Sequence, residues 1–212
     1  MSRYTLVVNV DRCIGCHACE MACKVENDVA LGSYWNRVLQ VGPTGEYPNM
    51  HVYWLPVQCQ QCEDAPCVHV CPAGASYRDP ETGIVLVDKA KCIGCKYCMM
   101  ACPYGVRSWN EEERVVEKCT LCSQRTATGG LPKCVEDCCA DARFFGDLDD
   151  PNSPASIAIK EADPATVHLM TDTGNRPTSR YILSGSIGEW VEVGKLRPVT
   201  PDWANSNWEE KQ

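Results

Sequence analysis

The chain has 212 residues, a formal net charge of −8 and 17 cysteines, but only two phenylalanines. An apolar core alone is not expected to organise such a fold, so disulfides or metal must help to hold it. The acidic balance argues against nucleic acid and anionic lipid as partners. The sequence also has no run of 18 apolar residues, so no direct membrane span is expected.

The N-terminal residues, MSRYTLVVNVDRC, contain neither the apolar core of a signal peptide nor a twin-arginine motif. Structural disulfides usually require an oxidising compartment and an even number of cysteines. Because the cysteine count is odd and no export signal is expected, the sequence favours metal ligation over a disulfide framework.

Sixteen of the 17 cysteines fall into four groups, and Cys139 is left over. The groups are CIGCHACEMAC (13–23), CQQCEDAPCVHVC (59–71), CIGCKYCMMAC (92–102) and CTLCSQRTATGGLPKCVEDC (119–138). Runs rich in β-branched and aromatic residues precede them and predict short strands at 4–10, 51–57, 83–88 and 114–118. The residues after the third cysteine of each group predict one or two helical turns, which Pro72 and Pro103 end in groups two and three.

Residues 146–212 contain no cysteine. Ser153 as an N-cap and Pro154 at the first helical position predict a short helix over 153–162. The remainder has no sustained periodicity. It is expected to be an extended tail that lies on this domain or on a partner, with a loosely ordered tail as the alternative.

The spacing C-x2-C-x2-C-x3-C of groups one and three is typical of 4Fe-4S ferredoxins. Three thiolates on one turn of chain hold three corners of a cubane cluster, and the fourth ligates the other cluster of a pair. Gly15 and Gly94 are expected to let backbone N–H groups approach sulfur. Group four alone would also suit zinc. His17 and His69 lack ligand spacing and are expected to be spacers or donors to sulfur.

Twenty residues separate Cys71 from Cys92, which suits two tandem halves of a bacterial ferredoxin. Groups two and three are therefore expected to share two 4Fe-4S clusters, and groups one and four to share two more. Cross-ligation then predicts four ligand sets: Cys13, Cys16, Cys19 and Cys138 (set one); Cys23, Cys119, Cys122 and Cys134 (set two); Cys59, Cys62, Cys67 and Cys102 (set three); Cys71, Cys92, Cys95 and Cys98 (set four).

Cys139 stands where the other fourth cysteines are followed by Pro or Lys. The x3 spacing favours Cys138 as the ligand and Cys139 as a free thiol, and the reverse assignment stays open. Thiolates and clusters add negative charge, which cations nearby must offset. The lysines that flank cysteines are candidates for this role, with ordinary surface lysines as the alternative; they are Lys24, Lys91, Lys96, Lys118 and Lys133.

The sequence contains no dinucleotide-binding fingerprint, P-loop, zinc-protease motif or nucleophile motif. Four clusters in one chain form a row of one-electron sites. We therefore expect a non-catalytic protein that carries electrons between a donor and a separate catalytic protein.

The order of the groups, with the stretches CPAGASYRDPETGIVLVDKAKCIGC, ACPYGVRSW, EKCTLC and ARFFGDLDDPNSP, resembles the four-cluster ferredoxin-type subunit of molybdopterin oxidoreductases of the dimethyl sulfoxide reductase family. The resemblance covers residues 3–155 densely. It implies an α+β fold of tandem ferredoxin-like βαβ modules with pseudo-two-fold symmetry, organised around the clusters, plus an irregular C-terminal tail.

The expected domains follow from the resemblance and the pairing. One module comprises 1–50 and 104–150 and holds the clusters of groups one and four. The second comprises 51–103 and holds those of groups two and three. Residues 151–212 are expected to form a C-terminal extension that packs on a partner subunit.

The resemblance implies a large catalytic subunit with molybdenum or tungsten on molybdopterin as the partner, near the set-one cluster. A quinol-oxidising membrane subunit or a soluble carrier is implied near the set-four cluster. The alternatives are a subunit serving a hydrogenase, a formate dehydrogenase or a nitrite reductase pathway, and a free-standing carrier. The expected location is the extracytoplasmic face of the cytoplasmic membrane, reached by co-export with a signal-bearing partner, with the cytoplasm as the alternative.

Overall fold

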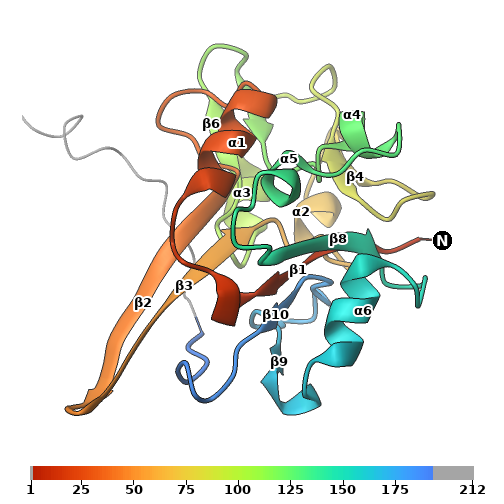
Figure 1. The fold of residues 1–212 in the computed structure, drawn as a ribbon. Coiled ribbons are helices and arrows are strands. Elements are labelled where there is room, and N and C mark those ends of the chain that lie inside the picture. The colour runs from red at the N-terminus through yellow and green to blue at the C-terminus, as the bar shows by residue number, and fades with distance from the viewer. Residues whose placement is uncertain (1, 193–212) are drawn as a thin grey trace, which may run out of the picture.

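The structure is a computed structural model that describes residues 2–192. Short helices and strands alternate along the chain, with long irregular connections between them (Figure 1). The strands are β1 (Tyr4–Asn9), β2 (Asn36–Glu46), β3 (Asn49–Gln58), β4 (Ser76–Arg78), β5 (Val85–Val87), β6 (Ser108–Asn110), β7 (Val115–Glu117), β8 (Arg143–Asp147), β9 (Val167–His168) and β10 (Arg180–Ile182). The helices are η1 (Val10–Arg12), α1 (Ala18–Glu26), α2 (Pro66–His69), α3 (Tyr97–Ala101), α4 (Ser123–Thr126), α5 (Lys133–Glu136), α6 (Pro154–Glu161) and η2 (Pro164–Thr166).

The largest sheet has the strand order β8-β1-β10-β9. β1 runs antiparallel to β8 and parallel to β10, so the N-terminal strand lies between two strands from the last third of the described chain. Its run of aliphatic residues is buried on both faces. Leu6 and Val8 join the main core, and Val7 packs with Ala155 of α6 on the other face. The strand predicted at 4–10 is thus confirmed as β1.

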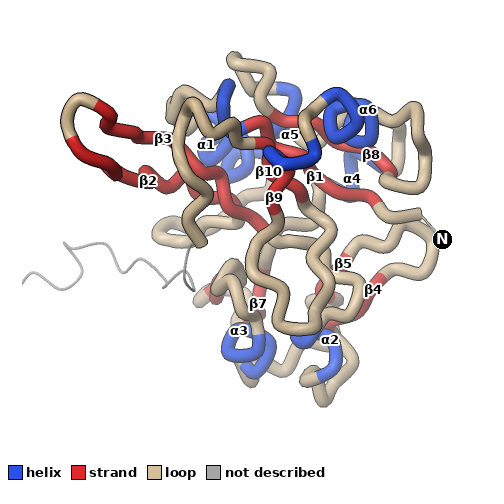
Figure 2. The backbone as a smooth tube through the Cα atoms, turned by 90° about the horizontal axis from the view of Figure 1, so that it is seen from below, coloured by secondary structure: helices blue, strands red, loops and turns tan. Residues whose placement is uncertain are grey.

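Three hairpins make up the other sheets, β2-β3, β4-β5 and β6-β7. The strands predicted at 51–57, 83–88 and 114–118 are confirmed as β3, β5 and β7. The β2-β3 hairpin is much longer than the others and projects from the body of the molecule (Figures 1 and 2). Its base stays in the core, because Leu55 and Val57 of β3 are buried there.

The helical turns expected after the third cysteines are confirmed, and they pack in two pairs. α1 of group one lies against α5 of group four, and α2 of group two lies against α3 of group three. Figure 2 shows these pairs in different parts of the molecule. Cysteines that are far apart in the sequence are thereby brought together by helix packing.

The helix predicted at 153–162 is confirmed as α6. Ser153 is its N-cap, since the Ser153 hydroxyl accepts a hydrogen bond from the backbone N–H of Ser156 at 3.2 Å, and Pro154 occupies the first turn. The expectation of an irregular tail after this helix is wrong for 167–168 and 180–182. Those residues form β9 and β10 and belong to the largest sheet of this chain. The expectations for 193–212 lie outside the described residues.

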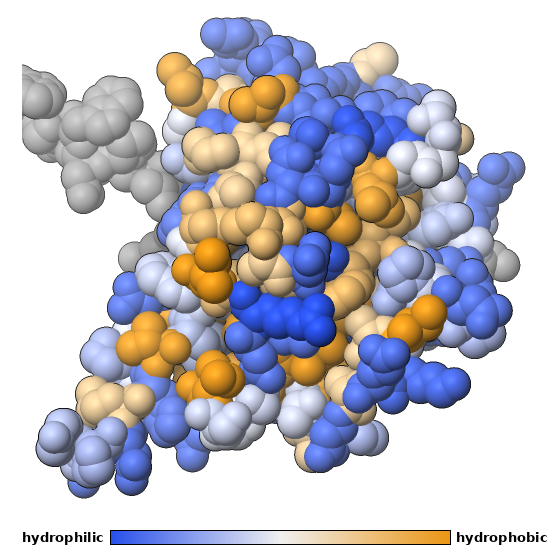
Figure 3. Space-filling model, in the orientation of Figure 1, coloured by the Kyte–Doolittle hydropathy of each residue, from blue (hydrophilic) through white to orange (hydrophobic). Residues whose placement is uncertain are grey.

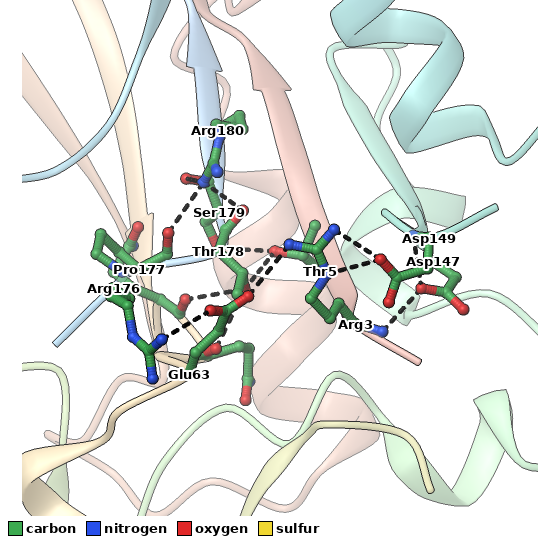
Figure 4. A network of polar contacts seen from close by, with 12 residues as sticks. Arg3, Thr5, Glu63, Asp147, Asp149, Arg176, Pro177, Thr178, Ser179 and Arg180 are labelled. Carbon is green, nitrogen blue, oxygen red and sulfur yellow. Dashed lines mark hydrogen bonds and ion pairs between the residues drawn. The ribbon is translucent and has the colours of Figure 1, made fainter. Parts of the chain in front are cut away.

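A polar network ties the segment before β10 to the rest of the fold (Figure 4). Arg3 pairs with Glu63 at 3.2 Å and with Asp149 at 2.6 Å. Arg176 also approaches Glu63, and the Thr178 hydroxyl lies 3.1 Å from that of Thr5. Residues 175–180 are therefore held both to β1 and to the residue that follows Cys62.

The described chain has mixed helix and strand content with small sheets, as an α+β ferredoxin-type fold requires. Hydrophobic side chains lie among hydrophilic ones on the face of Figure 3, over the region of α1 and the start of the β2-β3 hairpin. Within residues 2–192, no helix has the length and apolar character needed to cross a membrane.

Candidate iron–sulfur centres

Three hollows in the structure are each lined by four cysteines. The first is lined by Cys13, Cys16, Cys19 and Cys138, the second by Cys23, Cys119, Cys122 and Cys134, and another by Cys71, Cys92, Cys95 and Cys98. Their volumes are close to one another, about 350, 320 and 330 Å³ respectively. These groupings are sets one, two and four. The similar size and lining indicate that all three hollows are built for the same kind of group.

The cysteines of set three also gather in one place. The nearby thiols of Cys59, Cys67 and Cys102 add to the effect of burial, which together raise the pKa of Cys62 to about 12. The thiols of Cys59 and Cys67 act in the same direction on Cys102. All sixteen cysteines of the four groups thus lie in the fourfold arrangements that cross-ligation requires.

Zinc ligation by group four would need its own four cysteines to converge. The structure instead separates Cys138, which lines the first hollow, from Cys119, Cys122 and Cys134, which line the second with Cys23. Among the described residues, no three His, Cys, Asp or Glu side chains are spaced to share a single metal ion. The arrangement is that of thiols spread around a hollow.

The loops of groups one and three adopt the same local conformation. Gly15 and Gly94 have φ values of +66° and +69°, and His17 and Lys96 begin the following helices with φ values of 59° and 62°. Only glycine reaches the first of these conformations without strain. An aromatic ring covers each glycine, Trp54 at Gly15 and Trp109 at Gly94. The glycines are needed for close approach as well as for turning the chain.

Backbone N–H groups point at several of the sulfurs. Ser76 N–H donates to Cys71 Sγ at 3.4 Å, and Ala142 N–H donates to Cys138 Sγ at 3.3 Å. For Cys71, contacts of this kind outweigh burial and lower the pKa. Such donors stabilise thiolates, the form that binds iron.

The deeper thiols have the opposite shift when no metal charge is present. Burial, followed by the neighbouring Cys119 and Cys134, raises the pKa of Cys23. Burial, with Cys134 and Cys59 nearby, raises the pKa of Cys119 to about 12. Four such thiols can ionise together only if a cationic core lies between them, so this donor set fits a cluster.

Buried donors around the second hollow provide an independent test of the fit. Trp35 Nε1, Asn36 Nδ2 and Arg143 Nε are buried without a hydrogen-bond partner in the protein, and all three residues line this hollow. Leaving buried donors unpaired costs about 1–3 kcal/mol each. The thiolate and sulfide sulfurs of an anionic cluster would accept such bonds, so the residues present fit the group.

The structure separates the two alternatives for the lysines that flank cysteines. Lys118 is buried and donates to the carbonyl oxygens of Val85 and Cys119. The other four have partners away from the hollows: Lys24 with the carbonyls of Ala30 and Ser33, Lys91 with Asp88, Lys96 over the ring of Trp109, and Lys133 with Glu136 and Asp137. Only Lys118 of these five is a buried cation at the cysteine sets.

Sequence reasoning missed two buried cations, Arg107 and Arg143. Arg107 donates to Cys67 Sγ at 2.9 Å, and Arg143 lines both the first and the second hollow. The signal that was available is their common position, since each lies five residues after the fourth cysteine of its group. The expected role of the histidines as donors to sulfur is wrong: His17 contacts Glu20 at 3.0 Å and His69 contacts Asp64 at 2.6 Å.

Cys138 lines the first hollow, whereas Cys139 is exposed with its sulfur 3.7 Å from Cys16 Sγ. The placement of Cys138 corresponds to the ligand role that its spacing favours. Cys139 lies beside the set without lining the hollow.

Residues 50–148 match the 4Fe-4S dicluster domain family, and residues 6–26 match the 4Fe-4S binding domain. These are the domains of ferredoxin-type iron–sulfur proteins, the class that the fold and the cysteine sets define.

Relatives of known class cover most of the chain. A candidate dimethyl sulfoxide reductase iron–sulfur protein from Halobacterium salinarum is 44% identical over 211 residues, 86% of this chain and 79% of the relative. A sulfite dehydrogenase subunit from Allochromatium vinosum is 39% identical over 224 residues, 96% of this chain and 92% of the relative. A thiosulfate reductase electron transfer subunit from Salmonella typhi is 47% identical over 164 residues, 76% of this chain and 84% of the relative. The chain belongs to this family of 4Fe-4S iron–sulfur electron-transfer subunits.

Proposed function

We propose that the chain carries four 4Fe-4S clusters, held by sets one to four, and conducts electrons along them in that order. Each bound cluster would accept and give up one electron at a time. The observation that carries the proposal is the gradient of burial. Every cysteine of sets two and three is buried, whereas sets one and four each include an exposed cysteine, Cys16 and Cys95.

The neighbours of the buried sets support this order. Arg143 lines the hollows of sets one and two. The thiol of Cys59 in set three is close enough to act on the pKa of Cys119 in set two. Arg107 is influenced by Cys67 of set three and by Cys98 of set four. Each set therefore has the next one as its neighbour, and the exposed cysteines lie at the two ends of the series.

The proposed partner at the exposed end of set one is a large catalytic subunit that contains molybdopterin with molybdenum or tungsten. The relatives support this through their names, since one subunit of a dehydrogenase or reductase implies a companion subunit. A quinol-oxidising membrane subunit or a soluble carrier is proposed at set four. We also propose location at the extracytoplasmic face of the cytoplasmic membrane, by co-export with the catalytic subunit.

The proposed module division follows the helix pairs. Residues 1–50 and 104–150 would form one ferredoxin-like unit around α1 and α5, and 51–103 would form the other around α2 and α3. The pseudo-two-fold relation between the units and the packing of 151–212 on a partner are part of this proposal.

The partner proposal is tested by anaerobic purification of the full-length chain from its native cells. We expect a large subunit to co-purify, with a molybdopterin fluorescence signature after oxidation and with molybdenum or tungsten by elemental analysis. Fractionation of spheroplasts would place the complex outside the cytoplasm. A chain that is recovered alone, with its clusters intact, would contradict the partner and would favour a free-standing carrier.

A further inference from the structure

Two arginines occupy equivalent positions in the sequence and in the interior. Arg107 lies five residues after Cys102, and Arg143 lies five residues after Cys138. Each is 4% exposed. Buried arginines are rare unless something nearby needs their charge.

Arg107 lies between sets three and four. One of its nitrogens, Nη2, donates to Cys67 Sγ at 2.9 Å and to Ser76 Oγ at 2.8 Å. The guanidinium also lowers the pKa of Cys98, which belongs to set four. Its other terminal nitrogen, Nη1, is buried and has no hydrogen-bond partner in the protein.

Arg143 has the corresponding place between sets one and two. It lines both hollows, and its charge acts on Cys19 of set one and on Cys134 of set two. Its hydrogen bonds go to the amide oxygens of Asn36 at 3.3 Å and Gln58 at 3.1 Å. Neutral amides fix the orientation of the guanidinium and leave its full charge directed at the sulfurs.

We propose that each buried arginine is shared by two clusters and raises the reduction potentials of both, Arg143 for sets one and two and Arg107 for sets three and four. This inference rests on the proposed function, because it assumes clusters in all four sets. Reduction adds one negative charge to a site of low dielectric constant, and a fixed positive charge nearby stabilises that added electron. A guanidinium keeps its proton throughout, so its effect does not depend on pH.

Sharing has a second consequence. Electrons on neighbouring clusters repel each other, and a cation located between them reduces that repulsion. Each pair can then hold electrons at similar potentials, which favours transfer within the pair in either direction.

The test is a potentiometric titration of the full-length loaded protein, followed by EPR, with the variants Arg107→Gln and Arg143→Gln. Each variant should lower the equilibrium constant for reduction at least tenfold in two of the four one-electron steps, a shift of about 59 mV per tenfold change. A different two steps should move in each variant, and all four in the double variant. Lys160→Gln, which removes an exposed charge from α6, is the matched control and should move none.

Iron analysis accompanies every titration. Unchanged potentials in a glutamine variant that retains its iron overturn the inference, as does an equal shift of all four steps in both single variants. If a glutamine variant loses iron, the corresponding Arg→Lys variant decides. Full iron with potentials like those of the unmodified chain supports the charge role, and lost iron or a tenfold shift despite the retained charge overturns it. A wild-type chain with too little iron for four clusters would instead contradict the proposed function.

Discussion

Cys138 and Cys139 are adjacent in the chain, but their sulfurs have different surroundings. Cys138 faces the first hollow and accepts a backbone N–H from Ala142, while Cys139 is exposed beside Cys16. A serine at each position therefore distinguishes a ligand from a neighbour without altering the size of the side chain much.

We expect Cys138→Ser to lose or convert one cluster, and with it up to about four of about sixteen iron atoms per chain. Cys139→Ser should retain all of them, because its sulfur does not line the hollow. Iron and acid-labile sulfide analysis after anaerobic purification measures both. A full complement in Cys138→Ser together with a loss in Cys139→Ser would reverse the assignment.

The glycines of the cluster loops give a graded test at the same scale. A Cβ at Gly15 would lie 2.2 Å from the ring of Trp54, and one at Gly94 would lie 3.0 Å from the Arg114 carbonyl oxygen and the Trp109 ring. Gly129 has a similar positive φ of +82° with nothing within 4 Å. The three positions share the backbone strain and differ in crowding.

Alanine at Gly129 should cost about 1 kcal/mol from strain alone. Alanine at Gly94 and then at Gly15 should add an increasing steric cost, up to about 3 kcal/mol more. The rate of iron release to a chelator during anaerobic heating should follow the order Gly15→Ala, Gly94→Ala, Gly129→Ala, with the last close to the unmodified chain. Equal rates in all three variants would show that the aromatic rings do not confine the loops.

Among the elements, the segment that leads into β10 has an unexpected role at set three. Asn175 donates through Nδ2 to Cys62 Sγ at 3.1 Å and to the Tyr104 hydroxyl at 2.7 Å. The ion pairs of Arg3 and Arg176 with Glu63 hold this segment in place (Figure 4). A part of the chain without cysteines thus supplies a donor to a cysteine of the cluster series.

Asn175→Ala removes the N–H···S contact and should leave the sulfur of Cys62 richer in electrons. We expect the set-three cluster to become about threefold to tenfold harder to reduce, or about 30–60 mV lower in potential. The measurement is the same EPR titration, with the exposed Asn152→Ala as control. If the potential does not move while the iron content is intact, the contact has no electronic role.

The sequence predicts some of these elements well and others not at all, for physical reasons. Strands that precede cysteine groups are visible because alternating β-branched residues end at a fixed motif. β10 is only three residues long and pairs in parallel with a strand near the other end of the chain. Its formation depends on long-range packing, which leaves no local pattern to read.

The cations show the same difference. Lysines next to cysteines in the sequence are natural candidates, yet four of the five have partners elsewhere. Arg107 and Arg143 are separated from the nearest cysteine and reach the sets only through the turn of chain that follows it. Cysteine spacing defines what binds a cluster, whereas the residues that set its electrostatics depend on the completed fold.

At the scale of the whole molecule, the thiols themselves form much of the core. Many of the buried residues in the main core cluster are cysteines. Helix pairs α1–α5 and α2–α3 bring them into fourfold sets, and the burial of sets two and three leaves Cys16 and Cys95 exposed at the two ends. The central claim is that all four sets hold a cluster of the same type.

Quantitative iron and acid-labile sulfide analysis of the anaerobically purified full-length chain, with EPR spin quantitation after full reduction, tests this claim most directly. The account predicts about sixteen irons and about sixteen sulfides per chain, with spin for four interacting clusters. About eight of each, or stoichiometric zinc in place of iron, would contradict it.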